Sequence, residues 1–121
     1  MATNVLVVDD SSTSRKMLMK ALPPNWKVAI TQATNGQEAL ELYRQGKAEV
    51  MFLDLTMPVM DGFQLLEHLQ KEGLNCVVFV VSADVQPLAI ERAKKLGAAE
   101  FIPKPVTADK ITELLQRFGI V

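Results

Sequence analysis

The 121-residue sequence contains a single cysteine, Cys76, and a single histidine, His68. One cysteine excludes an internal disulfide and any metal site built from several cysteines. Acidic and basic side chains nearly cancel, 14 against 13, so the sequence offers no broad basic face for nucleic acid and no polybasic patch for a membrane. The longest apolar run, 76–81, falls far short of the roughly 20 residues that a membrane-spanning helix needs.

The N-terminus also lacks the features of a secretion signal, because no basic segment precedes a long apolar stretch there. We therefore expect a cytoplasmic protein whose cysteine thiol is reduced and buried in an apolar run. Hydrophobic residues make up 49% of the chain, enough for a core in a domain of this size. The expected organisation is a single domain over residues 1–121, without a second domain for output.

Short apolar runs alternate with segments of helical periodicity along the whole chain. Strands are predicted to begin near residues 4, 26, 50, 76 and 99, and each interval between them also holds one helix. Helix starts are indicated by Asn35-Gly36, by Asp61 with Gln64 three residues later, and by Thr107. This alternation predicts an α/β fold of five βα units around a parallel sheet.

The character of the apolar runs also predicts the order of the strands. The first, third and fourth runs are continuously apolar, as expected of strands covered on both faces. The second alternates and the fifth is short, so both are predicted at the edges of the sheet. A doubly wound sheet of order 2-1-3-4-5 with five helices, the flavodoxin-like arrangement, satisfies these conditions. Its binding crevice would lie beyond the carboxyl ends of the strands, where the winding reverses.

Polar residues follow four of the predicted strands directly: Asp9, Asp10, Asp54, Ser82 and Lys104. Any one of them alone could be a turn former or a helix cap. The topology, however, would bring all five to one edge of the sheet. Two carboxylates 4 Å apart repel by about 4 kcal/mol at an effective dielectric constant near 20, and one lysine offsets only part of this.

A divalent cation would relieve the remaining repulsion at this edge. Oxygen ligands without histidine favour Mg²⁺, or Mn²⁺, over zinc. Together with a lysine and a hydroxyl, such an ion suits a phosphoryl group, and an aspartate can serve as the nucleophile that forms an aspartyl phosphate. The residues thus predict phosphoryl chemistry at the strand ends.

The sequence resembles the receiver domain of two-component response regulators, over nearly all of residues 3–119, and within that family the stand-alone chemotaxis type. The motifs that carry the resemblance are VVDDSS at 7–12, DLTMPVMDG at 54–62, Ser82-Ala83 and Lys104-Pro105. The resemblance implies that Asp54 accepts a phosphoryl group from a histidine kinase. It also implies that Asp10, Asp54 and the Thr56 backbone carbonyl ligate Mg²⁺, with Asp9 acting through water.

The resemblance further implies that Ser82 and Lys104 bind the phosphoryl oxygens and that the Lys104–Pro105 bond is cis. In the family, the hydroxyl at the Ser82 position moves on activation and an aromatic side chain swings inward. That aromatic is Phe101 here, where relatives carry tyrosine, so tyrosine-dependent partner contacts do not carry over. The alternative reading is that Phe101 is a core residue of an edge strand.

The resemblance also implies output through a partner protein that binds the surface of the fourth helix, fifth strand and fifth helix. This surface includes Arg92, Lys94, Lys95, Phe101 and Lys104. The resemblance implies a histidine kinase, a phosphatase and a downstream target, with chemotaxis as the leading context. We expect a monomer that catalyses only its own aspartyl phosphorylation and dephosphorylation.

Two other functions fit parts of the pattern. A Mg²⁺-dependent phosphohydrolase of the haloacid-dehalogenase type also uses a strand-end aspartate. It requires a second aspartate two positions later, where this sequence has Thr56. A flavodoxin-like electron carrier would need a phosphate loop at 11–14, but that segment lacks glycine and follows two aspartates that repel phosphate. It is more readily explained as a helix cap.

Overall fold

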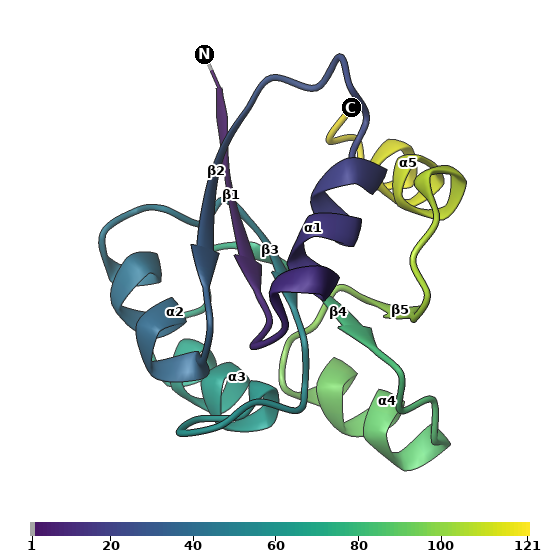
Figure 1. Cartoon of the computed structure of the whole chain (residues 1–121). Helices are drawn as coiled ribbons and strands as arrows, with labels where there is room; N and C mark the ends of the chain where they lie inside the picture. The colour runs from purple at the N-terminus through teal and green to yellow at the C-terminus, as the bar shows by residue number, and fades with distance from the viewer. Residues whose placement is uncertain (1) are drawn as a thin grey trace.

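A computed structural model describes residues 2–121 as five strands alternating with five helices (Figure 1). The elements are β1 (Thr3–Val8), α1 (Ser12–Ala21), β2 (Val28–Ala33), α2 (Gly36–Arg44), β3 (Val50–Leu53), α3 (Gly62–Lys71), β4 (Val77–Ser82), α4 (Pro87–Lys95), β5 (Glu100–Pro103) and α5 (Ala108–Arg117). The strands form one parallel sheet in the order β2-β1-β3-β4-β5, which confirms the predicted order.

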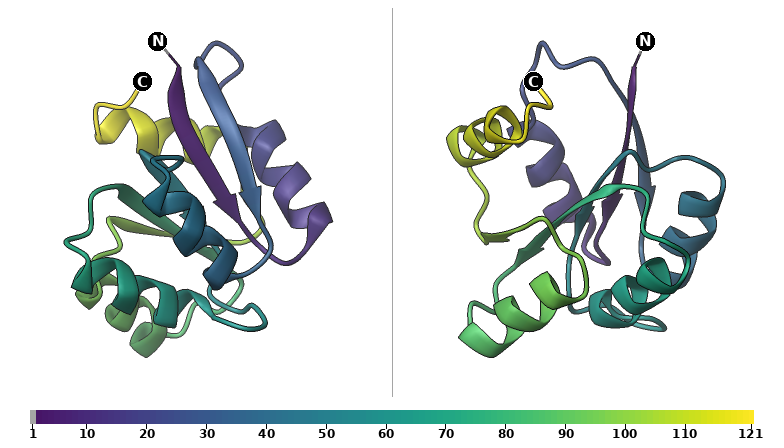
Figure 2. Two further views of the ribbon diagram at one scale, coloured as in Figure 1. Left: turned by 90° about the vertical axis from the view of Figure 1, so that its left-hand side faces the viewer. Right: turned by 180° about the vertical axis from the view of Figure 1, so that it is seen from behind.

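Helices cover both faces of the sheet. Figures 1 and 2 show α1 and α5 on one face and α2, α3 and α4 on the other. Side chains alternate along β1, so that Leu6 and Val8 join the core beneath α2, α3 and α4, while Val5 and Val7 join the core beneath α1 and α5. This double coverage explains why the central strands are continuously apolar.

The predicted elements are all present, with shifts at some ends. β2 begins at Val28 and not near 26, because a turn in which the Trp26 backbone N–H donates to the Pro23 carbonyl precedes it. Ile30 of β2 is 39% exposed, in keeping with the predicted place of this strand at the edge of the sheet. β4 and β5 each begin one residue later than predicted, at Val77 and Glu100.

The helix starts follow the local signals in the sequence. Asp61 and Gln64 form the predicted capping box, with reciprocal bonds of 2.9 and 3.0 Å between side chain and backbone. Thr107 caps α5, and the Ser11 hydroxyl accepts a bond from the Ser14 N–H, so the serine-rich segment caps α1 as expected. Each cap satisfies a backbone N–H in the first turn of its helix, which fixes where the helix begins after the preceding loop.

Two glycines allow the backbone to pack closely at this edge. A Cβ on Gly62 would lie 2.6 Å from the Asp54 carbonyl oxygen and 2.8 Å from the Leu55 Cα. A Cβ on Gly36 would lie 2.6 Å from the Met60 carbonyl oxygen. Both contacts involve the segment between β3 and α3, so these glycines determine how that segment sits against the start of α2 and α3.

Among residues 2–121, no helix has the length and apolar character needed to cross a membrane. Cys76 is partly buried beside the larger core, and burial raises the pKa of its thiol to about 12. The thiol is therefore less completely buried than predicted, and its raised pKa leaves little thiolate at neutral pH.

Candidate functional site at the carboxyl ends of the strands

Parallel pairing brings Asp9 and Asp54 side by side. Val8 and Leu53 are register partners in β1 and β3, and each is followed directly by one of these aspartates. The Asp54 N–H donates to the Val8 carbonyl at 2.9 Å, which extends the ladder one residue past the strand. The site therefore arises from the register of the two central strands.

Three carboxylates meet at this point. One carboxylate oxygen from each of Asp9, Asp10 and Asp54 lies within 4.8 Å of the other two. Asp9 and Asp54 are only 6% and 8% exposed, whereas Asp10 is exposed. Clustered oxygen ligands of this kind match the donor set that Mg²⁺ prefers, and the group includes no nitrogen or sulfur ligand. The residues present thus fit a hard divalent cation.

Lys104 supplies a positive charge to the cluster from the far end of the chain. Its Nζ lies 2.9 Å from Asp9 Oδ2 and 3.5 Å from Asp54 Oδ1, and it donates to the Ser14 hydroxyl at 3.5 Å. Burial alone would lower the pKa of Lys104, but pairing with Asp9 and Asp54 outweighs it and raises the pKa. The peptide bond from Lys104 to Pro105 is cis, as predicted.

Asp54 has an unusual ionisation equilibrium for a carboxyl group. Burial, followed by repulsion from Asp9, raises its pKa to about 6, although attraction to Lys104 acts in the opposite direction. A deprotonated Asp54 is therefore costly in this environment. A cation that paired with the carboxylate would lower that cost.

Ser82 ends β4, the strand next to β3, and Thr56 follows Asp54 in the segment after β3. Ser82 is the last residue of β4 and is 2% exposed, and its hydroxyl accepts a 3.1 Å bond from the Asp84 N–H. Thr56 lies two residues beyond Asp54 in the segment that leads to α3, with an exposed side chain. The roles predicted for these two residues, as phosphoryl and metal ligands, remain predictions.

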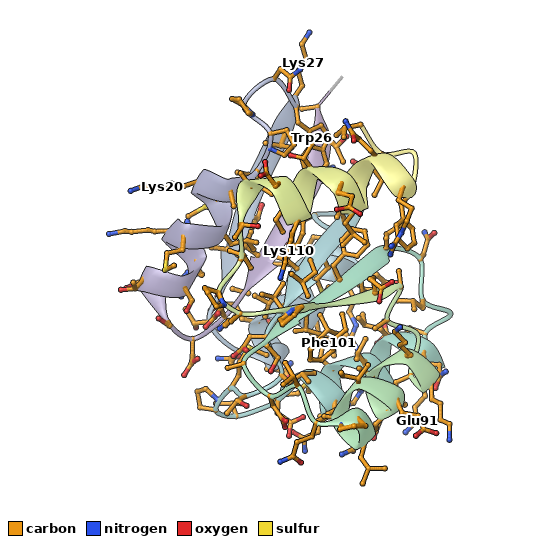
Figure 3. The ribbon with its side chains drawn as sticks, turned by 90° about the vertical axis from the view of Figure 1, so that its right-hand side faces the viewer. Lys20, Trp26, Lys27, Glu91, Phe101 and Lys110 are labelled. Atoms are coloured by element: carbon orange, nitrogen blue, oxygen red, sulfur yellow. The ribbon has the colours of Figure 1, made fainter. Side chains whose placement is uncertain are left out.

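Phe101 occupies β5 and is partly buried against the larger core. Figure 3 shows it between Lys110 of α5 and Glu91 of α4. The carboxylate of the preceding residue, Glu100, forms two ion pairs. Its Oε1 lies 3.1 Å from Lys94 Nζ of α4, and its Oε2 lies 2.7 Å from Arg117 Nη2 of α5. Sequence analysis missed this link between the two helices, and the only signal for it was an acidic residue on a short edge strand.

Arg15 is a second residue that sequence analysis missed. Its Nη1 donates to the Asp9 carbonyl at 2.7 Å, and its Nε donates to Gln32 Oε1 on β2 at 2.8 Å. The guanidinium thereby ties the turn that carries Asp9 and Asp10 to the edge strand. The planar geometry of arginine suits two such bonds at once, which a lysine could not reproduce.

Val59, in the segment between β3 and α3, has a left-handed backbone with φ of 67° and is 81% exposed. A β-branched residue is strained in this region.

Replacing Val59 with asparagine, which tolerates the conformation, should raise the free energy of unfolding by about 1 kcal/mol. Urea unfolding of both proteins measures the change. Val85→Asn, at a 53% exposed loop position without positive φ, is the control, and an equal gain there would contradict the explanation.

The fold and the acidic cluster define a response regulator receiver domain. The model of the "Response regulator receiver domain" family matches residues 5–116, and the chain belongs to that family. Phosphorylation on an aspartate and binding of Mg²⁺ are general properties of this family.

Within the family, the chain is CheY-like. It is 34% identical over 117 residues to the chemotaxis protein CheY of Thermotoga maritima, covering 97% of this chain and 98% of that one. Identity to CheY of Bacillus subtilis is 32% with the same coverage. A chain in the crystal structure of the CheX-CheY-BeF3-Mg+2 complex from Borrelia burgdorferi superposes with a TM-score of 0.86 at 30% identity, covering 96% of this chain and 89% of that chain.

Proposed function

We propose that Asp54 accepts a phosphoryl group from a histidine kinase and that the modified protein then binds a partner. The observation that carries this proposal is the meeting of three carboxylates within 4.8 Å, with Lys104 against two of them. In this role Asp10, Asp54 and the Thr56 carbonyl hold Mg²⁺ directly, and Asp9 holds it through water. The bound ion supplies charge neutralisation to the phosphoryl oxygens.

The reaction proposed for Asp54 is a displacement at phosphorus. A carboxylate oxygen of Asp54 forms the new O–P bond while the P–N bond to the kinase histidine breaks, and the imidazole leaves with its electron pair. Lys104 pairs with the phosphoryl oxygens as charge develops on them, and the Ser82 hydroxyl donates a hydrogen bond to one of them. Hydrolysis of the acyl phosphate by water returns Asp54 to its free form.

The output that we propose is a change in the surface of α4, β5 and α5. Ser82 would give up its bond from the Asp84 N–H and turn toward the phosphoryl group, and Phe101 would move into the space it leaves. Both residues lie on neighbouring strands, β4 and β5, so the movement of one bears directly on the other. Arg92, Lys94 and Lys95 belong to the face that a partner would contact.

Chemotaxis signalling is the context that we propose, on the strength of the CheY relatives. The protein would act in the cytoplasm as a monomeric switch that carries information and makes no product. Its kinase, phosphatase and target protein would be separate molecules.

The test is phosphorylation of the purified protein by acetyl phosphate with Mg²⁺, followed by intact-mass spectrometry. Wild-type protein should gain one phosphoryl group, and Asp54→Asn should gain none. Asp61→Asn is the matched control, because asparagine keeps the capping function of Asp61 while the same chemical change is made nearby. Unmodified wild-type protein, or a phosphorylated Asp54→Asn variant, would overturn the proposal.

If Arg15 positions the acidic turn, Arg15→Lys should weaken Mg²⁺ binding by about tenfold, since outer residues that orient ligands affect affinity on this scale. The substitution keeps the charge, so the loss would report geometry and not electrostatics. Titration calorimetry with Mg²⁺ measures the affinity. Lys16→Arg, at the exposed neighbouring position, should bind Mg²⁺ as the wild type does, and unchanged affinity in Arg15→Lys would contradict the positioning role.

A further inference from the structure

A cavity of about 340 Å³ adjoins the phosphoacceptor site on the side that α1 and α5 cover. It lies between α1, the sheet and the segment that leads from β5 to α5, and Figure 3 looks onto this side. Met17 lines the cavity and is itself 49% exposed, so the cavity opens to solvent beside this side chain. Its size is at the lower end of the range for pockets that hold small molecules. Asp54 and Lys104, which take part in the proposed phosphoryl transfer, line one end of the cavity, and the apolar remainder of its lining has no part in that reaction.

The walls of the cavity are apolar. Val7 and Phe52 form its floor on the sheet, Met17 and Leu18 line it from α1, and Val106 lines it from the opposite side. Water in such a space finds few hydrogen-bond partners, so its displacement by an apolar group is favourable. The cavity therefore favours a ligand with an apolar body.

One end of the cavity carries charge. Asp9, Asp54 and Lys104 line it there, and Asp10 belongs to the same carboxylate cluster. Three carboxylates against one ammonium leave a net charge of −2, and that ammonium already pairs with Asp9 at 2.9 Å. An anionic ligand would meet repulsion here, whereas an ammonium or amidinium group would meet unneutralised carboxylate.

We propose that this cavity binds an amphipathic organic cation, a small aromatic or aliphatic body with one ammonium or amidinium group, in competition with Mg²⁺. The cation would place its charged group against Asp9 and Asp54 and its body between α1 and Val106. The competition rests on the proposed function, because it requires Mg²⁺ to use the same Asp54 carboxylate. A bound cation would hold the protein in its unphosphorylated form, which makes the cavity an inhibitory site.

The test compares three probes that share a phenyl ring and differ in charge: 2-phenylethylamine, 2-phenylethanol and phenylacetate. Amide chemical shifts of the full chain, recorded by NMR without divalent cations, measure their binding. The amine should shift residues 17, 18 and 106 saturably, with a dissociation constant on the order of 0.1–1 mM. The neutral and anionic probes should bind at least about fivefold more weakly, and saturating Mg²⁺ should raise the apparent constant of the amine about tenfold.

Two substitutions on α1 locate the site. Met17→Trp should fill the entrance and weaken the amine at least about fivefold, whereas Lys20→Trp, at an exposed position on the same helix, should leave its binding unchanged. Val106→Phe provides a second obstruction from the opposite wall. Equal or tighter binding of the alcohol or the acid, absence of binding, or an amine insensitive to Mg²⁺ would overturn the proposal. Phosphorylation measured without the amine reports separately on the proposed function.

Discussion

Replacing Asp54 with asparagine should raise the free energy of unfolding at pH 7 by about 1–3 kcal/mol in a buffer without divalent cations. Burial and the neighbouring Asp9 raise the pKa of this carboxyl from 3.8 to about 6 in the folded protein. Ionisation of Asp54 therefore costs free energy in the folded state, and a neutral amide of the same shape removes that cost. The Lys104 ammonium keeps its bond to Asp9 in the variant.

The raised pKa of Asp54 also determines how the free energy of unfolding depends on pH. Between about pH 4 and pH 6, the folded protein holds a proton on Asp54 that the unfolded chain has released. Stability from this group is therefore present at low pH and is lost as the pH rises through about 6. The difference between Asp54→Asn and the wild type should be largest at pH 7 and above, and should vanish toward pH 4.

Urea unfolding of both proteins at a series of pH values measures this difference. Asp10→Asn removes the same charge from an exposed position and should have a smaller effect. Added Mg²⁺ should stabilise the wild type and leave Asp54→Asn nearly unchanged, because a ligand stabilises only the state that binds it. A variant no more stable than the wild type at pH 7, or a gain independent of pH, would refute the explanation.

Gly62→Ala should lower the free energy of unfolding by about 2–3 kcal/mol, although alanine is the better helix former. The new Cβ would lie 2.6 Å from the Asp54 carbonyl oxygen and 2.8 Å from the Leu55 Cα, and neither is a flexible side-chain atom. The Gly62 N–H also donates to the Leu55 carbonyl at 2.9 Å, so α3 cannot move away without loss of that bond. The backbone next to the phosphoacceptor must shift.

Such a shift should weaken Mg²⁺ binding together with stability, because Asp54 and Thr56 lie in the displaced segment. Thermal unfolding and Mg²⁺ titration of the same preparation test both effects. Gly73→Ala is the control, since Gly73 has a positive φ of 83° and open space around it. It should cost about 1 kcal/mol from backbone conformation alone and leave Mg²⁺ affinity unchanged. If both substitutions changed stability and Mg²⁺ affinity equally, the steric explanation for Gly62 would be wrong.

Features encoded by local sequence were predictable. The capping box of Asp61 and Gln64 and the cap at Thr107 depend on residues three apart, and both are present. The sheet order followed from which apolar runs are continuous. That order alone brought Asp9, Asp54 and Lys104 to one edge, because parallel strands end on the same side.

What could not be predicted depends on side-chain direction or on a single backbone angle. Arg15 meets Gln32, 17 residues away, only because α1 lies beside the end of β2. Glu100 meets Arg117 across two elements, and nothing in the sequence specifies that geometry. The left-handed backbone at Val59 occurs at a residue type that does not favour it.

The family match leaves the phosphohydrolase alternative without support.

The bond between Lys104 and Asp9 joins positions 95 residues apart, one directly after the first strand and the other directly after the last. During synthesis, a chain whose fifth strand has not yet emerged carries the complete carboxylate cluster but no ammonium to balance it. Wherever such a partial chain brings its aspartates together, their repulsion lacks the attraction that Lys104 supplies in the finished protein. The ion pair at this edge therefore requires the segment after β5 to be synthesised and placed beside the end of β1.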